Sequence, residues 1–247
     1  MAIAKQIQLS EEFILPPDEI ESDEPEFESS LHLQQIILLL QCLEWLWQDR
    51  NDFFAAGNLS VYYIYNSPEQ PTKLRDFCGP DFFVVLNTVR KNRKSWMVWR
   101  EGGKYPNLIV EILCDSTAKV DRTEKKQLYQ DVFRLPDYYF DPVTLEFAGF
   151  TLVSGQYQLL QPNEQGLLWS EQLKLYLGVY ESQLRYFTSE GELVPTPEEF
   201  AKQAQSQLDE AQQLELERQE KIRTTRSKTT QSTIKSVRRR TKSLNVK

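Results

Sequence analysis

Histidine and cysteine are scarce in this chain. Its 247 residues include one histidine, His32, and three cysteines that stand far apart in apolar surroundings, Cys42, Cys78 and Cys114. A zinc site needs several such side chains at close spacing, so the composition argues against one. It favours reduced, buried thiols in a cytoplasmic protein.

A long apolar run is missing as well. The longest apolar region, residues 31–47, is interrupted by glutamines and a glutamate, which make it too polar to span a bilayer. Residues 1–10 contain no apolar stretch followed by a small-residue cleavage site, so they do not resemble a signal peptide. These two absences predict a cytoplasmic protein that has no membrane partner.

Positive charge is absent near one end and concentrated at the other. Nine acidic residues and no lysine or arginine lie between Glu11 and Glu28, whereas ten lysines and arginines and no acid lie between Lys221 and Lys247. The net charge of -7 therefore divides into -17 on residues 1–220 (-7 minus +10) and +10 on the rest. An acidic body has no general affinity for nucleic acid, but the basic tail could contact it.

Composition divides the chain into four segments. Residues 1–29 are acidic and contain three prolines, so we expect a disordered lead-in. Residues 30–196 hold the apolar runs of a folded domain. Residues 197–222 have a polar helical pattern whose apolar stripe is short, so a frayed helix and a coiled-coil homodimer both stay open. Residues 223–247 are expected to be a basic, disordered tail.

The order of elements in the folded domain predicts an α/β fold. A mostly apolar helix is expected over residues 31–48, with Ser29 or Ser30 as its cap, and a turn over residues 55–58. Strands are expected at residues 59–65, 80–86, 108–113 and 137–142, a helix at 116–132, and a hairpin within 145–160. Runs that are apolar on both faces indicate a doubly covered sheet. We therefore predict a central mixed sheet flanked by helices, plus a C-terminal helical appendage.

Two of these apolar runs each carry one carboxylate. Asp81 opens the run at residues 80–86, and Glu111 lies inside the run at 108–113. An ionised carboxylate is costly to bury unless it is paired or binds a metal. If the two strands are neighbours, Asp81 and Glu111 converge, and the backbone carbonyl of Ile112 becomes a third oxygen ligand for Mg²⁺.

A lysine beside such a pair would keep the carboxylates ionised and orient the attacking water. Its commonest position, two residues after the second acid, is a leucine here. In the following helix, Lys125 shares a face with Tyr129 and can reach toward Glu111, whereas Lys126 is turned about 100° away. Lys119 is a weaker substitute.

Six short motifs occur in a characteristic order: Ala56-Gly57-Asn58-Leu59, Pro80-Asp81-Phe82-Phe83-Val84-Val85, Ile109-Val110-Glu111-Ile112-Leu113, Asp121-Arg122-Thr123-Glu124-Lys125 with Tyr129, Asp137-Tyr138-Tyr139-Phe140-Asp141-Pro142, and Leu168-Trp169-Ser170-Glu171 with Leu177-Gly178-Val179. Each motif alone is weak, but the ordered set is specific. It resembles the Uma2 family (the DUF820 group), which is common in cyanobacteria and belongs to the restriction-endonuclease-like PD-(D/E)XK superfamily. The resemblance spans roughly residues 30–200.

This resemblance implies a nuclease-like fold and an endonuclease that hydrolyses DNA with Mg²⁺ or Mn²⁺. Asp81 and Glu111 would hold the metal, and Lys125 would assist. One departure is Pro106-Asn107, where many members have Pro-Asp before the second strand. Because a fold carries many functions, the alternative is a catalytically inactive nuclease-like scaffold that binds nucleic acid or protein.

Several polar residues also have structural interpretations. Asp81 could simply open a strand, and Glu111 could form a structural ion pair. Tyr129 and His32 fit packing or capping roles better than catalytic ones.

Two further groups of polar residues lie outside these motifs. Glu44 and Asp52 are weak candidates for extra metal ligands. The basic stretch at residues 91–94, with Trp96 and Trp99, fits a loop with partly buried aromatics better than a surface that stacks on nucleic acid.

Overall fold

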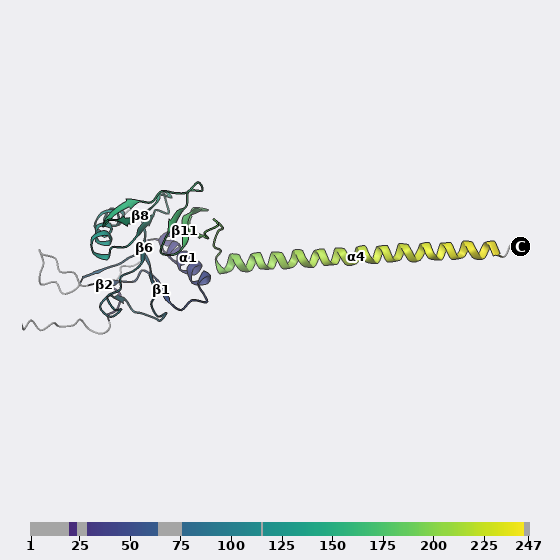
Figure 1. Cartoon of the computed structure of the whole chain (residues 1–247), viewed down its shortest axis with the longest axis horizontal. Coiled ribbons are helices and arrows are strands. Elements are labelled where there is room, and N and C mark those ends of the chain that lie inside the picture. The colour runs from purple at the N-terminus through teal and green to yellow at the C-terminus, as the bar shows by residue number, and fades with distance from the viewer. Residues whose placement is uncertain (1–19, 24–28, 64–75, 115, 245–247) are drawn as a thin grey trace, which may run out of the picture. The chain divides into compact units, whose positions relative to one another are not determined.

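The computed structural model describes residues 20–23, 29–63, 76–114 and 116–244 of the chain (Figure 1). Contacts divide the chain into two compact units, Met1–Val194 and Pro195–Lys247. Most of the expected lead-in and the end of the strand expected at residues 59–65 lie outside the described residues.

A six-stranded mixed sheet forms the centre of the first unit. Its strands lie in the order β1-β4-β6-β7-β8-β9; β6 pairs with β7 in parallel and the other neighbours pair antiparallel. All five residues of β6 are buried, as expected for a strand covered on both faces. The strands are β1 (Phe53–Gly57), β4 (Phe82–Leu86), β6 (Leu108–Ile112), β7 (Asp137–Phe140), β8 (Phe147–Val153) and β9 (Gln156–Leu159).

Helix α1 (Ser30–Leu46) covers one face of this sheet. The Ser29 hydroxyl caps it by accepting the backbone N–H of His32 at 3.1 Å. On its other side, α1 contacts a second sheet, where the Gln35 amide donates to the Leu184 carbonyl at 2.9 Å. The helix is thus buried between two layers, as its apolar pattern predicted. The second sheet consists of β10 (Leu168–Ser170), β11 (Leu175–Tyr180) and β12 (Gln183–Phe187).

A helical segment between β6 and β7 covers the opposite face. Its buried residues Tyr129 and Phe133 pack in one cluster with Val85 and Ile109 of the sheet. The sequence predicted a regular helix over residues 116–132, but much of the segment consists of π-helical turns, which are wider than α turns. It comprises α2 (Ala118–Val120), η1 (Asp121–Lys125), α3 (Lys126–Leu128) and η2 (Tyr129–Phe133), where η marks a π-helix.

Residues 55–57 belong to β1, so the turn expected over residues 55–58 is wrong for three of its four positions. They pair with residues 82–84 of β4, and this backbone pairing outweighs their weak strand propensity. Gly57 has a packing reason, because a Cβ there would lie 2.2 Å from Ile36 Cγ2 on α1. The turn is confined to Asn58, whose φ is 47°.

Trp96 belongs to the core and not to an exposed stacking surface. It is fully buried, its ring stacks on Phe54 with centroids 5.6 Å apart, and the Arg93 guanidinium lies 4.8 Å from its centroid. Arg93 also pairs with Glu101 at 2.7 Å. The expectation of a buried aromatic is therefore confirmed for Trp96, whereas the expected loop is wrong at this position, because Trp96 lies in a strand. Its strand β5 (Trp96–Met97) joins β2 (Val61–Tyr63) and β3 (Asp76–Cys78) in a small third sheet.

The second unit contains one long helix, α4 (Pro197–Leu244, 48 residues). The sequence predicted a disordered tail from residue 223, whereas the helix continues to Leu244. No glycine and no further proline interrupts residues 198–244, and missing apolar periodicity bears on packing, not on helix formation. Among the described ranges, no helix is long and apolar enough to cross a bilayer.

The carboxyl of Asp137 is buried with few groups nearby to stabilise its charge. Asp137, at the start of β7, is 2% exposed, and its Oδ1 has no hydrogen-bond partner among the described residues. Burial raises the pKa of Asp137 to about 8, while the positive charge of Lys126 opposes this shift and the nearby Asp121 adds to it. The folded state therefore holds this proton between pH 4 and pH 8, where the unfolded chain releases it.

We predict that Asp137→Asn flattens part of the pH dependence of stability. In the wild type, proton binding by the folded state makes the free energy of unfolding fall by about 1.4 kcal/mol per pH unit as the pH rises through this range. The wild type should therefore lose up to about 4 kcal/mol relative to Asp137→Asn between pH 5 and pH 8. Denaturant unfolding of both proteins at several pH values measures the difference. A constant difference would show that Asp137 has an ordinary pKa.

Candidate functional site

The pairing of β4 with β6 brings Asp81 beside Glu111. Phe82 lies opposite Val110 in an antiparallel register, so the preceding residue, Asp81, falls next to Glu111. The Asp81 backbone N–H donates to Glu111 Oε2 at 3.3 Å, and the Ile112 backbone N–H donates to Asp81 Oδ2 at 2.7 Å. The structure thus brings together the two carboxylates that the sequence analysis singled out.

Glu111 is buried in the middle of this group, with a side chain that is 1% exposed. Its Oε1 accepts the Tyr129 hydroxyl at 2.5 Å, and its Oε2 accepts the Lys125 amine at 3.1 Å. Burial raises the pKa of Glu111 well above its ordinary value, and the charge of Lys125 opposes that rise. Asp81 and Asp121 add to the rise, because each places a further negative charge nearby.

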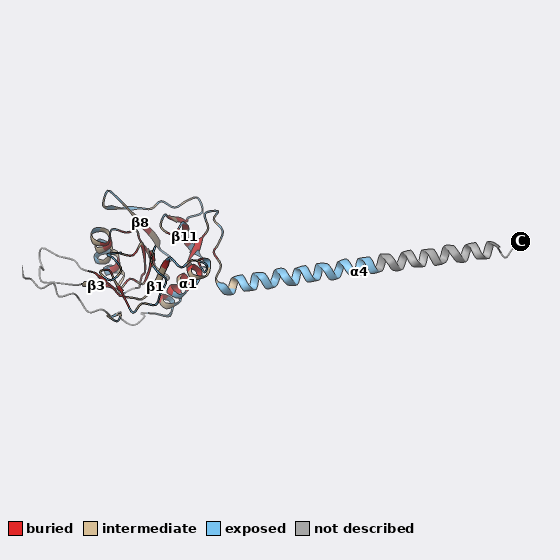
Figure 2. Cartoon of the chain, turned by 60° about the horizontal axis from the view of Figure 1, so that its bottom comes forward, coloured by how far each residue is buried: buried red, intermediate tan, exposed pale blue. Residues whose placement is uncertain are grey.

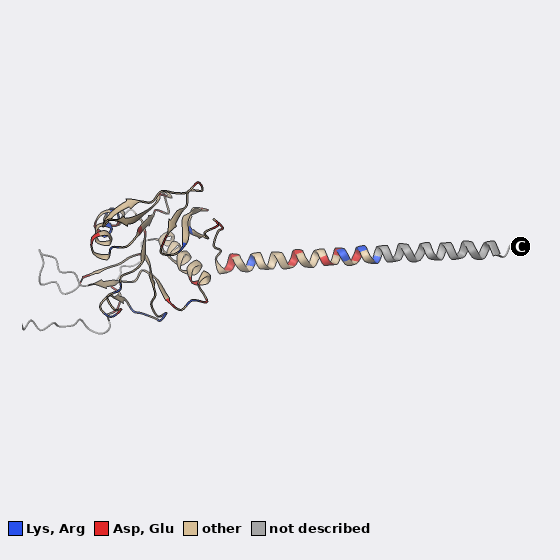
Figure 3. Ribbon diagram, viewed as in Figure 1, with Lys and Arg blue, Asp and Glu red and all other residues tan. Residues whose placement is uncertain are grey.

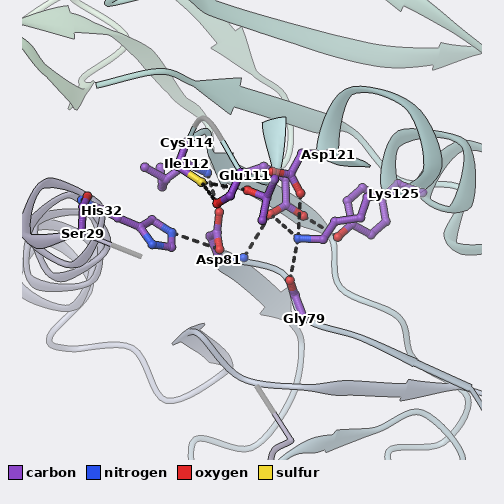
Figure 4. A network of polar contacts seen from close by, with 12 residues as sticks. Ser29, His32, Gly79, Asp81, Glu111, Ile112, Cys114, Asp121 and Lys125 are labelled. Carbon is purple, nitrogen blue, oxygen red and sulfur yellow. Dashed lines mark hydrogen bonds and ion pairs between the residues drawn. The ribbon is translucent and has the colours of Figure 1, made fainter. Parts of the chain in front are cut away.

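Lys125 is the cation of the site (Figure 4). Its Nζ contacts the Gly79 carbonyl at 2.9 Å, Glu111 Oε2 at 3.1 Å and Asp121 Oδ1 at 2.9 Å. Burial alone would lower the pKa of the Lys125 amine, but the carboxylates of Glu111 and Asp121 outweigh it and raise the pKa above its ordinary value. Lys125 therefore stays protonated throughout the physiological range.

Lys126 points elsewhere, as its place on the helix predicted. Its Nζ lies 3.3 Å from the centroid of the Phe150 ring on β8. Lys119 is exposed, and Leu113, at the position where a lysine is commonest, is buried with 1% exposure. The geometry expected of Lys125 relative to Glu111 is thus present, while its chemical role stays a prediction.

Two residues of the site, His32 and Asp121, were not predicted to belong to it. His32 Nε2 lies 3.1 Å from Asp81 Oδ1, on the side of Asp81 away from Lys125 (Figure 4). Asp121 pairs with Lys125 on the same helical segment, and its side chain is 1% exposed. Asp121 was visible as an acid four residues before Lys125. No local signal identified His32, because its contact depends on where α1 packs.

Tyr129 packs in the core as expected and has a polar contact besides. It was interpreted as a packing residue, and it is fully buried, but its hydroxyl bonds the central carboxylate. Glu44 and Asp52 pair with arginines instead, Glu44 with Arg90 and Asp52 with Arg50 at 2.8 Å. Neither has a contact with the Asp81 and Glu111 pair among those that the structure describes.

Two side-chain carboxylates and one backbone carbonyl offer the oxygen ligands that a hard cation such as Mg²⁺ takes. Within the described ranges, no three acidic, histidine or cysteine side chains form a metal cage by themselves. Mg²⁺ commonly takes one or two carboxylates and completes its shell with water and phosphate oxygens. The N–H and C=O of one strand residue face the same side, so the Ile112 carbonyl faces the edge where its N–H meets Asp81.

The charge balance of the site favours a cation as well. The carboxylates of Asp81, Glu111 and Asp121 surround a single lysine, and all three raise its pKa. Their mutual repulsion appears in the raised pKa of Glu111. A divalent cation held by Asp81 and Glu111 would offset this excess of negative charge.

We predict that Tyr129→Phe destabilises the fold, because the buried Glu111 carboxylate loses a hydrogen-bond donor. The free energy of unfolding should fall by about 1–3 kcal/mol in denaturant titrations at neutral pH. Tyr105→Phe is the matched control, since Tyr105 is half-buried against the same cluster; its change should stay within about 0.5 kcal/mol. Equal losses in the two variants would mean that the bond to Glu111 contributes nothing particular.

Comparison with known proteins identifies the family of this chain. No curated protein matches it. A solved structure described as a putative nuclease belonging to DUF820 from Anabaena variabilis ATCC 29413 is similar with a TM-score of 0.44 and 11% identity, over 63% of this chain and 80% of that one. The model of the Uma2 family, described as a putative restriction endonuclease, matches residues 19–180. The chain therefore belongs to the Uma2 family, whose restriction-endonuclease-like α/β fold was expected from its motifs.

Proposed function

We propose that this protein is an endonuclease that hydrolyses phosphodiester bonds in DNA with the help of Mg²⁺ or Mn²⁺. The observation that carries the proposal is the convergence of Asp81, Glu111 and Lys125, which come from three separate elements of the fold. Membership of a family described as a putative restriction endonuclease supports the same reaction class. DNA as the substrate and a cytoplasmic location remain predictions.

Asp81, Glu111 and the Ile112 carbonyl would hold the ion. When bound, such an ion activates water and offsets charge on the phosphate. The Ile112 N–H donates to Asp81 Oδ2, and His32 Nε2 contacts Asp81 Oδ1. These contacts keep the Asp81 carboxylate in one orientation before any ligand arrives, which reduces the cost of ordering the site.

Lys125 would act as a positively charged hydrogen-bond donor and not as a general base. Its raised pKa means that the amine keeps its proton, so it can hydrogen-bond a phosphate oxygen as negative charge grows there. Tyr129 would act at one remove, as a positioning residue that holds Glu111 through Oε1. No histidine base is needed in this scheme, because a bound metal would lower the pKa of its water. His32 lies on the side of Asp81 away from Lys125 (Figure 4).

One observation favours the alternative of an inactive scaffold that binds nucleic acid or protein. All three contacts of the Lys125 amine go to groups of the protein itself, and both oxygens of Asp81 are engaged. A site in which every donor is already satisfied has to exchange partners before it can act. Metal binding without cleavage would be the signature of this alternative.

We predict that Asp81→Ala abolishes metal-dependent DNA cleavage. Loss of a metal-holding carboxylate removes several kcal/mol of transition-state stabilisation, so the rate should fall by about 10²–10⁴-fold or below detection. Cleavage of supercoiled and linear DNA with Mg²⁺ or Mn²⁺ measures the rate, and calorimetric titration measures metal binding. Asp49→Ala, which removes an exposed carboxylate, is the control. If Asp81→Ala and the wild type cut alike over a range of metals and substrates, the proposal is wrong.

We predict that Lys125→Met lowers the cleavage rate by about 10²–10³-fold, as expected for the loss of a donor aimed at developing charge. Lys126→Met removes the same charge one residue away and should leave the rate nearly unchanged, since Lys126 lies over Phe150.

An effect of Lys125→Met on folding has to be distinguished from an effect on the cleavage rate. Lys125→Met leaves Glu111 and Asp121 without their cation and can destabilise the domain. Lys125→Arg keeps the charge and displaces the donor, so it should retain a cooperative thermal transition while its rate falls. A fully active Lys125→Arg together with an active Lys125→Met would remove Lys125 from the reaction.

A further inference from the structure

Helix α4 presents a long surface that nothing in its own unit covers. All described side chains from residue 201 to residue 223 are exposed, which Figure 2 shows as an uninterrupted pale blue stretch. At 1.5 Å per residue, the 48 residues of α4 are about 72 Å long. Within its own unit, the described stretch 201–223 gains no stability from packing, which is the main source of helix stability in proteins.

Local interactions within α4 supply little compensation. The ion pairs Glu198–Lys202 and Glu217–Lys221 have the i,i+4 spacing but are exposed, and such pairs contribute about 0.3–0.5 kcal/mol each. Residues 224–233 include five threonines and two serines, which are poor helix formers. The helix therefore needs a partner to account for its length.

One side of α4 carries an apolar row. Phe200, Ala204, Leu208 and Ala211 lie within about 40° of Ile222 around the helix axis, at about 100° per residue. Phe200 is 48% exposed, Leu208 52% and Ile222 59%. By the same periodicity, positions 237 and 244, a valine and a leucine, fall within about 60° of Ile222. The row is densest at residues 200–211; between Ala211 and position 237, Ile222 is its one apolar member, and the same side there carries Glu215, Arg218 and Arg226.

The net charge along α4 changes sign close to Ile222. Residues 197–220 contain seven acids and two bases, for a net charge of -5 (2 minus 7), whereas residues 221–244 contain nine bases and no acid, for a net charge of +9. Figure 3 shows the acidic residues and the change toward basic residues along the described part of α4. The two halves are therefore complementary to each other and not to themselves.

We propose that α4 pairs with α4 of a second copy of this chain, antiparallel, with the two Ile222 residues near the two-fold axis. This arrangement sets the acidic half of each helix against the basic half of the other. It brings position 200 opposite 244 and position 208 within one residue of the place opposite 237, so that apolar residues meet across the axis. A parallel pair would set -5 against -5 and +9 against +9, which is strongly unfavourable.

A symmetric pair of identical helices is a self-complementary interface, the commonest kind among homodimers. The basic half is also the feature that suggested contact with nucleic acid. The complementary acidic half on the same helix favours a second copy as its occupant. The inference does not depend on whether the Asp81 and Glu111 site cleaves DNA.

Sedimentation equilibrium of the full chain tests the pairing. The wild type should have twice the mass of the 29.0 kDa chain. Ile222→Lys places two like charges at the axis and should yield the single-chain mass. Gln213→Lys adds the same charge on the opposite side of the helix, about 180° from Ile222, and should remain a dimer. High salt should weaken the wild-type dimer, because the pairing of the two halves is electrostatic.

Cysteine cross-linking tests the direction. Under mild oxidation, a mixture of Leu208→Cys and Val237→Cys chains should form a mixed disulfide dimer, whereas Leu208→Cys alone should not. The unsubstituted chain, with its three native cysteines, is the control. Efficient self-linking of Leu208→Cys would overturn the antiparallel arrangement.

Two outcomes would overturn the pairing itself. One is a wild type with the single-chain mass at all concentrations studied. The other is a single-chain mass combined with binding of double-stranded DNA that disappears when the basic half is neutralised, which would assign that half to nucleic acid.

Discussion

The ion pair between Lys125 and the buried carboxylate of Glu111 is the interaction on which the rest of the site depends. Glu111 is almost inaccessible in the middle of β6, and an unpaired charge there would cost several kcal/mol. Lys125 and the Tyr129 hydroxyl offset that cost from one side of the sheet. Lys125 also holds the Gly79 carbonyl, just ahead of Asp81, so one amine ties the helical segment, β6 and the start of β4 together.

This arrangement couples the stability of the domain to the chemistry we propose for it. Three carboxylates gather around Lys125, and their mutual repulsion weakens the fold. Polar groups at functional sites often reduce stability in this way. Asp137 adds a further buried carboxyl on the neighbouring strand, so the acid content of the core is higher than folding alone requires.

Much of the fold and the centre of the site could be predicted from local patterns. The apolar runs at β4 and β6 predicted doubly covered strands, and the convergence of Asp81 and Glu111 was expected on the condition that these strands are neighbours, which their pairing and register fulfil. Helical spacing predicted that Lys125 and not Lys126 would face Glu111, which the contacts of both lysines confirm. These predictions succeeded because each rests on a short stretch of chain with one strong periodicity.

The parts that escaped prediction depend on contacts between distant segments. His32 reaches Asp81 because α1 packs across the sheet, and no local signal carries that information. Residues 55–57 looked like a turn, yet their pairing with β4 and the approach of Ile36 to Gly57 make them a strand. The course of α4 beyond residue 222 was missed for another reason, since the absence of an apolar stripe was taken as absence of a helix.

The π-helical turns between β6 and β7 limit how this domain can change during evolution. Asp121, Lys125 and Tyr129 are four residues apart, and they lie in a segment whose turns alternate between wide and ordinary. Deleting one residue from η1 would favour ordinary α turns there, which are the more favourable backbone. The same deletion would rotate every later side chain by about 100° and swing Tyr129 off Glu111. The length of this segment is therefore as much a part of the site as its side chains are.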